Sequence, residues 1–104
     1  DSRSDWGSDA DKKELDDTFQ YLSDTFISKG IPVIIDECGA INKNENTSAR
    51  AAWYGYYISA AKKKGIKCFV WDSGEKKDGF ALLNRKDCTW YYPEIIQAIQ
   101  NAVQ

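Results

Sequence analysis

The chain has 104 residues, of which 42% are hydrophobic, and its 14 basic and 16 acidic residues leave a net charge of −2. This composition suits one folded domain and excludes a disordered tail. The sequence has no basic stripe for phosphates, and no segment approaches the roughly 20 apolar residues of a membrane span. We therefore expect neither nucleic acid nor a membrane as a partner.

The side-chain inventory also limits the chemistry. The sequence has no histidine, and its cysteines, Cys38, Cys68 and Cys88, form no CxxC pair. Because histidine and clustered cysteine are the usual zinc ligands, we expect no metal and no cofactor. We expect mostly buried thiols. Acid–base chemistry would have to use carboxylates.

The first element is a helix over residues 11–28. Asp11, followed by Glu14, fits a capping box, and Gly30 stands where a helix C-cap belongs. Apolar residues recur at helical spacing at Leu15, Phe19, Leu22 and Phe26.

A strand follows over "IPVIIDE", residues 31–37, with Pro32 at its entrance. Its aliphatic residues lack the polar alternation of a half-exposed strand, which predicts burial on both faces. The strand ends in Asp36 and Glu37. Since a buried carboxylate without a partner is costly, these acids call for an explanation.

A second helix is predicted from Thr47 and Ser48, both good N-caps, to the lysines before Gly65. Its apolar stripe would consist of Ala49, Ala52, Trp53, Tyr56, Tyr57 and Ala60.

The helix–glycine–strand pattern then repeats. "GIPVIIDE" begins at Gly30 and "GIKCFVWD" at Gly65, an offset of 35 residues. A βα repeat of this kind places its strands in parallel. After a long loop, Pro93 begins a last helix, whose predicted face is Ile95, Ile96, Ile99 and Val103. Eight such units would make about 280 residues, close to a (β/α)8 TIM barrel, so the chain fits the closing part of that α/β fold.

In such a barrel, the carboxyl ends of the strands form the active face. Glu37 ends the first strand, and Trp71 with Asp72 ends the second. Because successive strand residues point to opposite faces, Asp72 cannot share the barrel interior with Trp71. A salt-bridged acid or a loop cap is the structural alternative for Glu37.

Several motifs together resemble the C-terminal part of family 5 glycoside hydrolases, the cellulase family. They are "GIPVIIDECGA", the N-capped helix with Arg50, "GIKCFVWDSG" and "FALLNR", in this order. The resemblance implies that residues 1–104 are a C-terminal fragment of a single TIM-barrel catalytic domain. It would comprise helix 6, strand 7, helix 7, strand 8 and helix 8, incomplete without a larger N-terminal chain of the same barrel. Asp36 and Cys38 stand where the family usually has glycine and phenylalanine.

The resemblance also implies a function, that of a secreted, extracellular, retaining endo-β-1,4-glucanase acting on β-glucan polysaccharide. Glu37 would be the catalytic nucleophile and Trp71 would line the subsite of the reacting sugar. Trp6, in "DWGSD", would belong to a sugar subsite, with loop packing as its alternative.

The family's acid/base glutamate lies in an Asn-Glu-Pro motif that this sequence lacks. The resemblance therefore implies that this residue belongs to the upstream part and that the chain alone is inactive. The competing interpretation is a non-catalytic carbohydrate-binding module with a tryptophan platform, although such modules are usually β-sandwiches.

Overall fold

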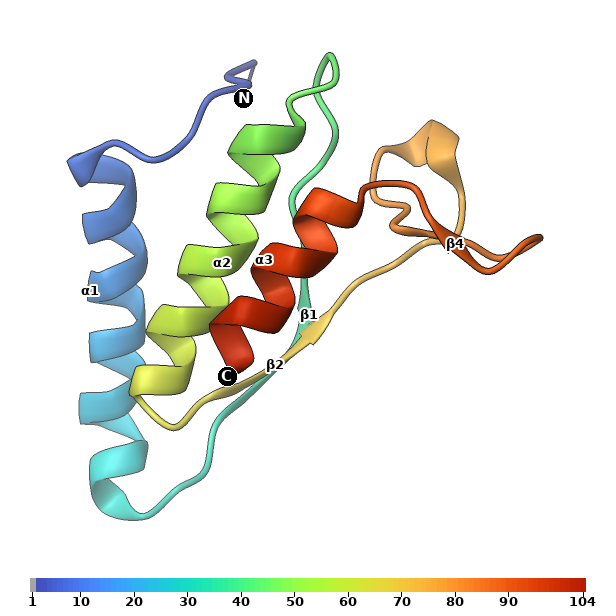
Figure 1. The fold of residues 1–104 in the computed structure, drawn as a ribbon. Helices are drawn as coiled ribbons and strands as arrows, with labels where there is room; N and C mark the ends of the chain where they lie inside the picture. The colour runs from blue at the N-terminus through green and yellow to red at the C-terminus, as the bar shows by residue number, and fades with distance from the viewer. Residues whose placement is uncertain (1) are drawn as a thin grey trace.

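The structure is a computed structural model that describes residues 2–104. It consists of a layer of helices packed on one face of a short parallel sheet, with a small hairpin between the sheet and the last helix (Figure 1). In chain order the elements are α1 (Asp9–Thr25), η1 (Ile27–Lys29), β1 (Ile34–Cys38), α2 (Thr47–Lys63), β2 (Lys67–Val70), η2 (Lys76–Asp78), β3 (Leu83–Asn84), β4 (Thr89–Trp90) and α3 (Pro93–Val103).

Helix α1 begins one turn earlier than predicted. Its N-cap is Ser8, whose side chain accepts from the Asp11 N–H at 3.1 Å, while the Asp11 carboxylate accepts from the Ser8 N–H at 3.1 Å. The predicted Asp11–Glu14 box is wrong because Asp11 is the third residue of the helix, not its cap. The hydrogen bond from Arg3, with those from Gly7 and Ser8, holds the pKa of Asp11 well below its usual range. The predicted end at residue 28 is too late, because α1 ends at Thr25 with Phe26 as its C-cap. Gly30 instead closes the short 3-10 helix η1, in the left-handed conformation at φ 78°.

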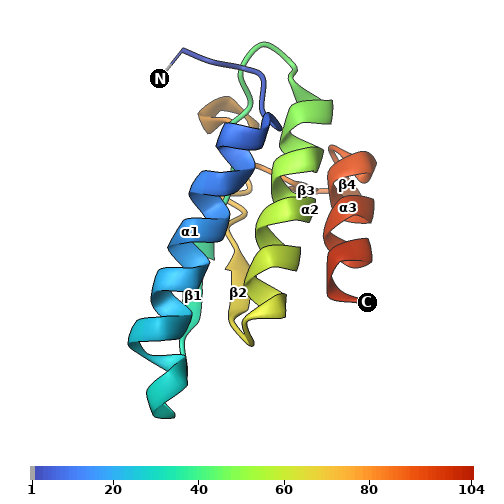
Figure 2. The same ribbon diagram turned by 90° about the vertical axis from the view of Figure 1, so that its left-hand side faces the viewer.

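Helix α2 begins after Asn46, and Thr47 and Ser48 lie inside it, so neither is the cap. Its buried residues are Arg50, Ala51, Tyr54, Ile58 and Ala61. The predicted stripe is therefore offset, although Trp53, Tyr57 and Ala60 are partly buried beside the core. The helix is apolar on nearly all sides because α1, α3 and the sheet surround it (Figure 2), so periodicity alone could not select its inner face.

Helix α3 begins at Pro93 as predicted. Ile95 is fully buried. Val103, which was expected on the buried face, is 56% exposed, and its neighbour Ala102 is buried instead. Val103 is the last residue of the helix, where Lys62 of α2 donates to its backbone carbonyl at 2.9 Å while its side chain stays exposed.

Strands β1 and β2 are parallel, as the repeat predicted. Ile34 pairs with Lys67, Ile35 with Cys68 and Cys38 with Val70. Between these last two pairs β1 has two residues, Asp36 and Glu37, where β2 has one, Phe69. This extra residue is a β-bulge.

The two faces of this sheet differ. The helix-facing side belongs to a cluster built on Phe19, Ala61 and Ile66, with Val33, Ile35 and Cys68 packed against it. On the other side, Ile34, Phe69 and Trp71 are 59%, 58% and 45% exposed. Burial on both faces is wrong for this chain, because its helices cover only one of them (Figures 1 and 2). We call the uncovered side, with Ile34, Phe69 and Trp71, the open face.

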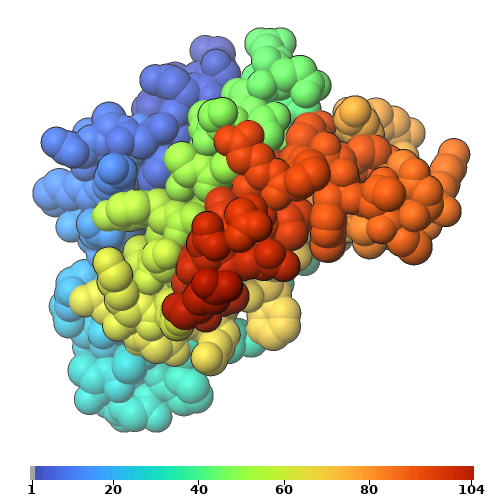
Figure 3. Space-filling model, in the orientation of Figure 1, coloured from blue at the N-terminus to red at the C-terminus, as the bar shows by residue number. Residues whose placement is uncertain are grey.

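The predicted long loop contains secondary structure of its own. β3 and β4 pair antiparallel, with Leu83 opposite Trp90 and Asn84 opposite Thr89. This hairpin protrudes from the helix layer (Figure 3). No helix within residues 2–104 has both the length and the apolar character needed to cross a membrane.

Candidate active site

The bulge in β1 determines which way Glu37 faces. Ile35 and Cys38 both contact the helix side of the sheet, although strict alternation would put residues three apart on opposite faces. The extra residue in the bulge restores Cys38 to the helix side, where it is 7% exposed. Glu37, its exposed neighbour, is therefore directed to the open face.

Trp71 lies beside Glu37 at the end of the neighbouring strand. Its N–H donates to the Cys38 carbonyl at 2.8 Å, which fixes the two strand ends at the same level. Trp71 alternates with Val70, which packs on the helix side, so the indole lies on the open face. The structure thus brings together two of the three predicted site residues, Glu37 and Trp71.

Asp72 has a different environment. Its Oδ1 accepts from the N–H groups of Leu82 at 2.8 Å and Gly74 at 3.2 Å, and Arg85 Nη2 lies 3.3 Å from its Oδ2. Burial raises the pKa of Asp72, but the hydrogen bonds from Leu82, Gly74, Leu83 and Arg85 outweigh it and the net pKa is lowered. A carboxylate held in its charged form is unsuited to donate a proton, so Asp72 fastens the loop after β2.

The thiols of Cys38 and Cys68 are held in their neutral form, which is a poor nucleophile. Burial, and then the nearby Cys68, raises the pKa of Cys38 to about 12, and burial raises the pKa of Cys68. Cys38 is buried, Cys68 half-buried and Cys88 exposed, and all three are free. Within residues 2–104, no group of three or more histidine, cysteine, aspartate or glutamate side chains is arranged to hold a metal ion.

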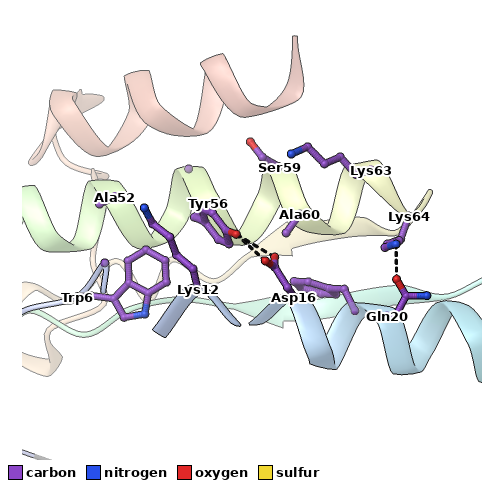
Figure 4. Close-up of a pocket in the computed structure, with 13 residues that line it drawn as sticks. Trp6, Lys12, Asp16, Gln20, Ala52, Tyr56, Ser59, Ala60, Lys63 and Lys64 are labelled. Atoms are coloured by element: carbon purple, nitrogen blue, oxygen red, sulfur yellow. Dashed lines mark hydrogen bonds between the residues drawn. The ribbon is translucent and has the colours of Figure 1, made fainter. Parts of the chain in front are cut away.

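Trp6 lies with the helices, not on the open face. Its ring is tilted against Tyr56, with centroids 5.6 Å apart. The two rings line a groove of about 800 Å³ between α1 and α2, in which Asp16 accepts from the Tyr56 hydroxyl at 2.8 Å (Figure 4). Neither Glu37 nor Trp71 lines this groove. The geometry matches the loop-packing alternative, and a sugar contact at Trp6 stays a prediction.

Two residues beneath the site were given no role from the sequence, although the helix with Arg50 is one of the motifs that resemble the family. Arg50 and Tyr54 on α2 are 1% and 0% exposed, and both contact the segment that follows Glu37. An arginine one turn into a helix of small and aromatic residues was the available signal, because a buried guanidinium must find carbonyl or carboxylate partners.

The βα repeat, with Glu37 and Trp71 exposed at its strand ends, matches the class of parallel βα barrels, in which the carboxyl ends of the strands form the active face. A family model described as cellulase, glycosyl hydrolase family 5, matches residues 1–77. The chain belongs to this family.

Curated relatives agree. Endoglucanase A of Clostridium longisporum is 47% identical over 98 residues, which cover 90% of this chain and 19% of that protein. Endoglucanase 1 of Ruminococcus albus is 41% identical, over 86% of this chain and 24% of that protein. The chain thus spans about a fifth of their length.

Solved structures extend the match to three dimensions. A glycoside hydrolase 5 lichenase from Caldicellulosiruptor sp. F32, in complex with cellotetraose, superposes with a TM-score of 0.92 at 38% identity. The match covers 98% of this chain and 28% of that one. A GH5-4 broad specificity endoglucanase from Clostridium longisporum gives a TM-score of 0.87 at 43% identity, over 98% and 31% of the two chains. The family is a TIM-barrel family, and these residues are a small piece of that fold.

Proposed function

We propose that the protein is a retaining endo-β-1,4-glucanase and that this chain supplies the nucleophile half of its active site. In this proposal α1, β1, α2, β2 and α3 are helix 6, strand 7, helix 7, strand 8 and helix 8 of the barrel. The observation that carries the proposal is the position of Glu37, which the bulge directs to the open face beside Trp71. The chain's family gives this position its chemical meaning.

Glu37 would act as nucleophile. In a retaining mechanism one carboxylate attacks the anomeric carbon, while a second carboxylic acid protonates the departing glycosidic oxygen. Water then cleaves the glycosyl–enzyme ester with the second residue acting as base. The Glu37 carboxylate has no hydrogen-bond or ion-pair partner within residues 2–104, so nothing described would have to be displaced before the attack.

Trp71 would hold the sugar that reacts. Its indole presents a large apolar surface, and it is 45% exposed on the side of the sheet that carries Glu37. The C–H face of a glucose ring can stack on such a surface, which would bring the anomeric carbon towards the neighbouring strand end.

The acid/base residue would come from a larger N-terminal part of the same barrel. The two carboxyl groups of a retaining enzyme lie about 5–5.5 Å apart, and Asp72 is already engaged by the loop after β2. The exposed Ile34 and Phe69 on the open face support a partner that covers them. Expressed alone, residues 1–104 should aggregate or stay molten and show no hydrolysis.

The substrate would be a β-glucan. One of the similar proteins is named as a lichenase in complex with cellotetraose, and another is named as a broad specificity endoglucanase. We further propose that the enzyme is secreted, since such polymers are outside cells, and activity should then be found in culture supernatant.

The test uses the complete protein with cellotetraose as substrate. Proton NMR in the first minutes should show the β-anomer as the initial product, which then equilibrates with the α-anomer. Initial α-anomer would refute the retaining mechanism. Binding of cellotetraose without cleavage would favour the carbohydrate-binding alternative, whose usual β-sandwich differs from the helix layer observed here.

A further inference from the structure

The bulge that directs Glu37 also weakens its backbone support. Between the Ile35–Cys68 and Cys38–Val70 pairs, Asp36 and Glu37 lie opposite a single residue of β2, Phe69, so the regular one-to-one pairing is interrupted there. The direction of the Glu37 side chain therefore depends on what holds the chain on either side of the bulge. Upstream, the regular ladder holds it, and downstream the Trp71 N–H holds the Cys38 carbonyl.

A second downstream anchor comes from helix α2. The Ala40 N–H donates to the Tyr54 hydroxyl at 3.1 Å, and Arg50 Nε donates to the Ala40 carbonyl at 2.9 Å. The N–H and the carbonyl of Ala40 are thus both bound by buried side chains of α2. Gly39 adds to the fit, because a Cβ there would lie 3.3 Å from both the Tyr54 hydroxyl and the Phe80 ring.

Arg50 extends this anchor to the loops after β2. Its Nη2 lies 3.4 Å from the Gly79 carbonyl, and its guanidinium lies over the Tyr92 ring at 4.8 Å from the centroid. The Gly79 carbonyl also accepts from the Asn42 N–H at 2.8 Å. One guanidinium therefore links the segment after β1, the segment after β2 and the start of α3.

Stability alone does not explain an arginine at this position. A buried guanidinium is costly unless its N–H groups are bonded, and Arg50 Nη1 has no partner within the described residues. A buried ion or polar group can often be replaced by a well-packed apolar residue without loss of stability. What the apolar residue could not do is bind the Ala40 and Gly79 carbonyls together.

We propose that Arg50 and Tyr54 are positioning residues that hold the bulged end of β1 so that the Glu37 carboxylate is aimed at the substrate. This inference rests on the proposed role of Glu37 as nucleophile. Neither residue would touch the sugar. Both act through the backbone at Ala40, three residues after Glu37.

The test is time-dependent inactivation of the complete enzyme by a 2-deoxy-2-fluoro cellobioside with a dinitrophenolate leaving group. Tyr54→Phe removes only the hydroxyl that accepts from Ala40. Arg50→Lys keeps the charge but loses the planar fork that reaches two carbonyls at once. The matched control is Tyr57→Phe on the same helix. The Tyr57 hydroxyl that it removes has no hydrogen-bond partner in the described chain.

Inactivation gives a binding constant and a rate constant separately. In Tyr54→Phe and Arg50→Lys the rate constant should fall about ten- to a hundredfold, because small displacements of reacting groups cost this much. The binding constant should stay unchanged, and Tyr57→Phe should match the wild type in both. Rates are normalised to the folded fraction, so a purely structural effect would change that fraction and leave the rate constant alone.

Wild-type rate constants in folded Tyr54→Phe would overturn the inference, even if Arg50→Lys fails to fold. The proposed function has its own readout in the same experiment, the peptide that carries the fluoro-sugar in the wild type. A label outside residues 30–40 would overturn both, whereas unaffected rates with the label on Glu37 would overturn only the positioning role.

Discussion

β1 and β2 run in parallel and each is followed by an acid at the same edge of the sheet, yet the two carboxylates have opposite surroundings. Asp72 accepts hydrogen bonds from the Leu82 and Gly74 N–H groups and pairs with Arg85. Glu37 is exposed and has no such partner in residues 2–104. The same sequence pattern, an apolar run closed by an acid, thus produces one carboxylate that fastens loops and one that is exposed without such a partner in residues 2–104, as the proposed nucleophile should be.

The difference arises from one residue of register. Without the bulge, the Glu37 side chain would lie on the helix side of the sheet, as Ile35 does. Beyond the end of β2, continued alternation directs Asp72 away from the open face, on which Trp71 lies. The end of each strand therefore directs one residue of the proposed site to the open face, Glu37 from β1 and Trp71 from β2.

The largest effect should come from Glu37→Gln in the complete enzyme. The amide is nearly isosteric but cannot form the glycosyl ester, so kcat on cellotetraose should fall by several orders of magnitude, as expected for removal of a nucleophile. Circular dichroism should remain that of the wild type. The matched control is Asp36→Asn, one residue away in the same bulge, which should retain most of the activity; equal losses in both variants would break the distinction between the two acids.

Trp71→Ala should be next in size and should act on activity more than on stability. Loss of the stacking surface beside Glu37 should lower kcat/KM about ten- to a hundredfold, because the reacting sugar would no longer be oriented. Since the indole is 45% exposed, little core packing is lost with it.

Trp53→Ala is the counterpart to this change. The Trp53 ring stacks on Tyr57 with centroids 4.6 Å apart and packs against the core cluster of α2 and α3. Its truncation should cost about 3 kcal/mol of unfolding free energy, at the lower end for buried aromatics. Chemical denaturation of both variants makes the comparison, and equal destabilisation would mean that Trp71 is a packing residue.

Asp72→Ala should have the smallest effect on catalysis and a clear one on stability. It leaves the buried Leu82 N–H without its acceptor, which typically costs about 1–3 kcal/mol. Glu75→Ala, an exposed acid in the same loop, should be neutral.

The pH dependence of this stability difference follows from the pKa of Asp72. The folded pKa is lowered, so the contribution is present above the unfolded value of about 3.9 and is lost as the pH falls through the folded one. Thermal unfolding of wild type and Asp72→Ala should therefore converge in acid; a difference that grows in acid would contradict the assignment.

The sequence predicted the parallel βα repeat because both strands follow a left-handed glycine and a helix, signals that are local in the chain. It failed where tertiary contacts decide. Arg3 and Gly7 bind Asp11 and fix the start of α1 a turn early, and α2 is surrounded on several sides, which removes the polar face that periodicity needs.

For the site, Glu37 at the end of the first strand and Trp71 at the end of the second could be recognised in the sequence as parts of a family motif. The bulge was not, because register is a property of the strand pair and no residue type between Ile35 and Cys38 announces it. The contacts of Arg50 and Tyr54 with Ala40 span ten and fourteen residues of sequence and required the packed structure.

The central claim is that Glu37 is the residue that bonds to the sugar. The most direct measurement is peptide mapping by mass spectrometry of the complete enzyme after trapping with the fluoro-sugar. We expect one labelled peptide containing residues 33–40, with fragment ions that place the added mass on Glu37. A label on Asp36 or Asp72, or on a residue outside this chain, would contradict it.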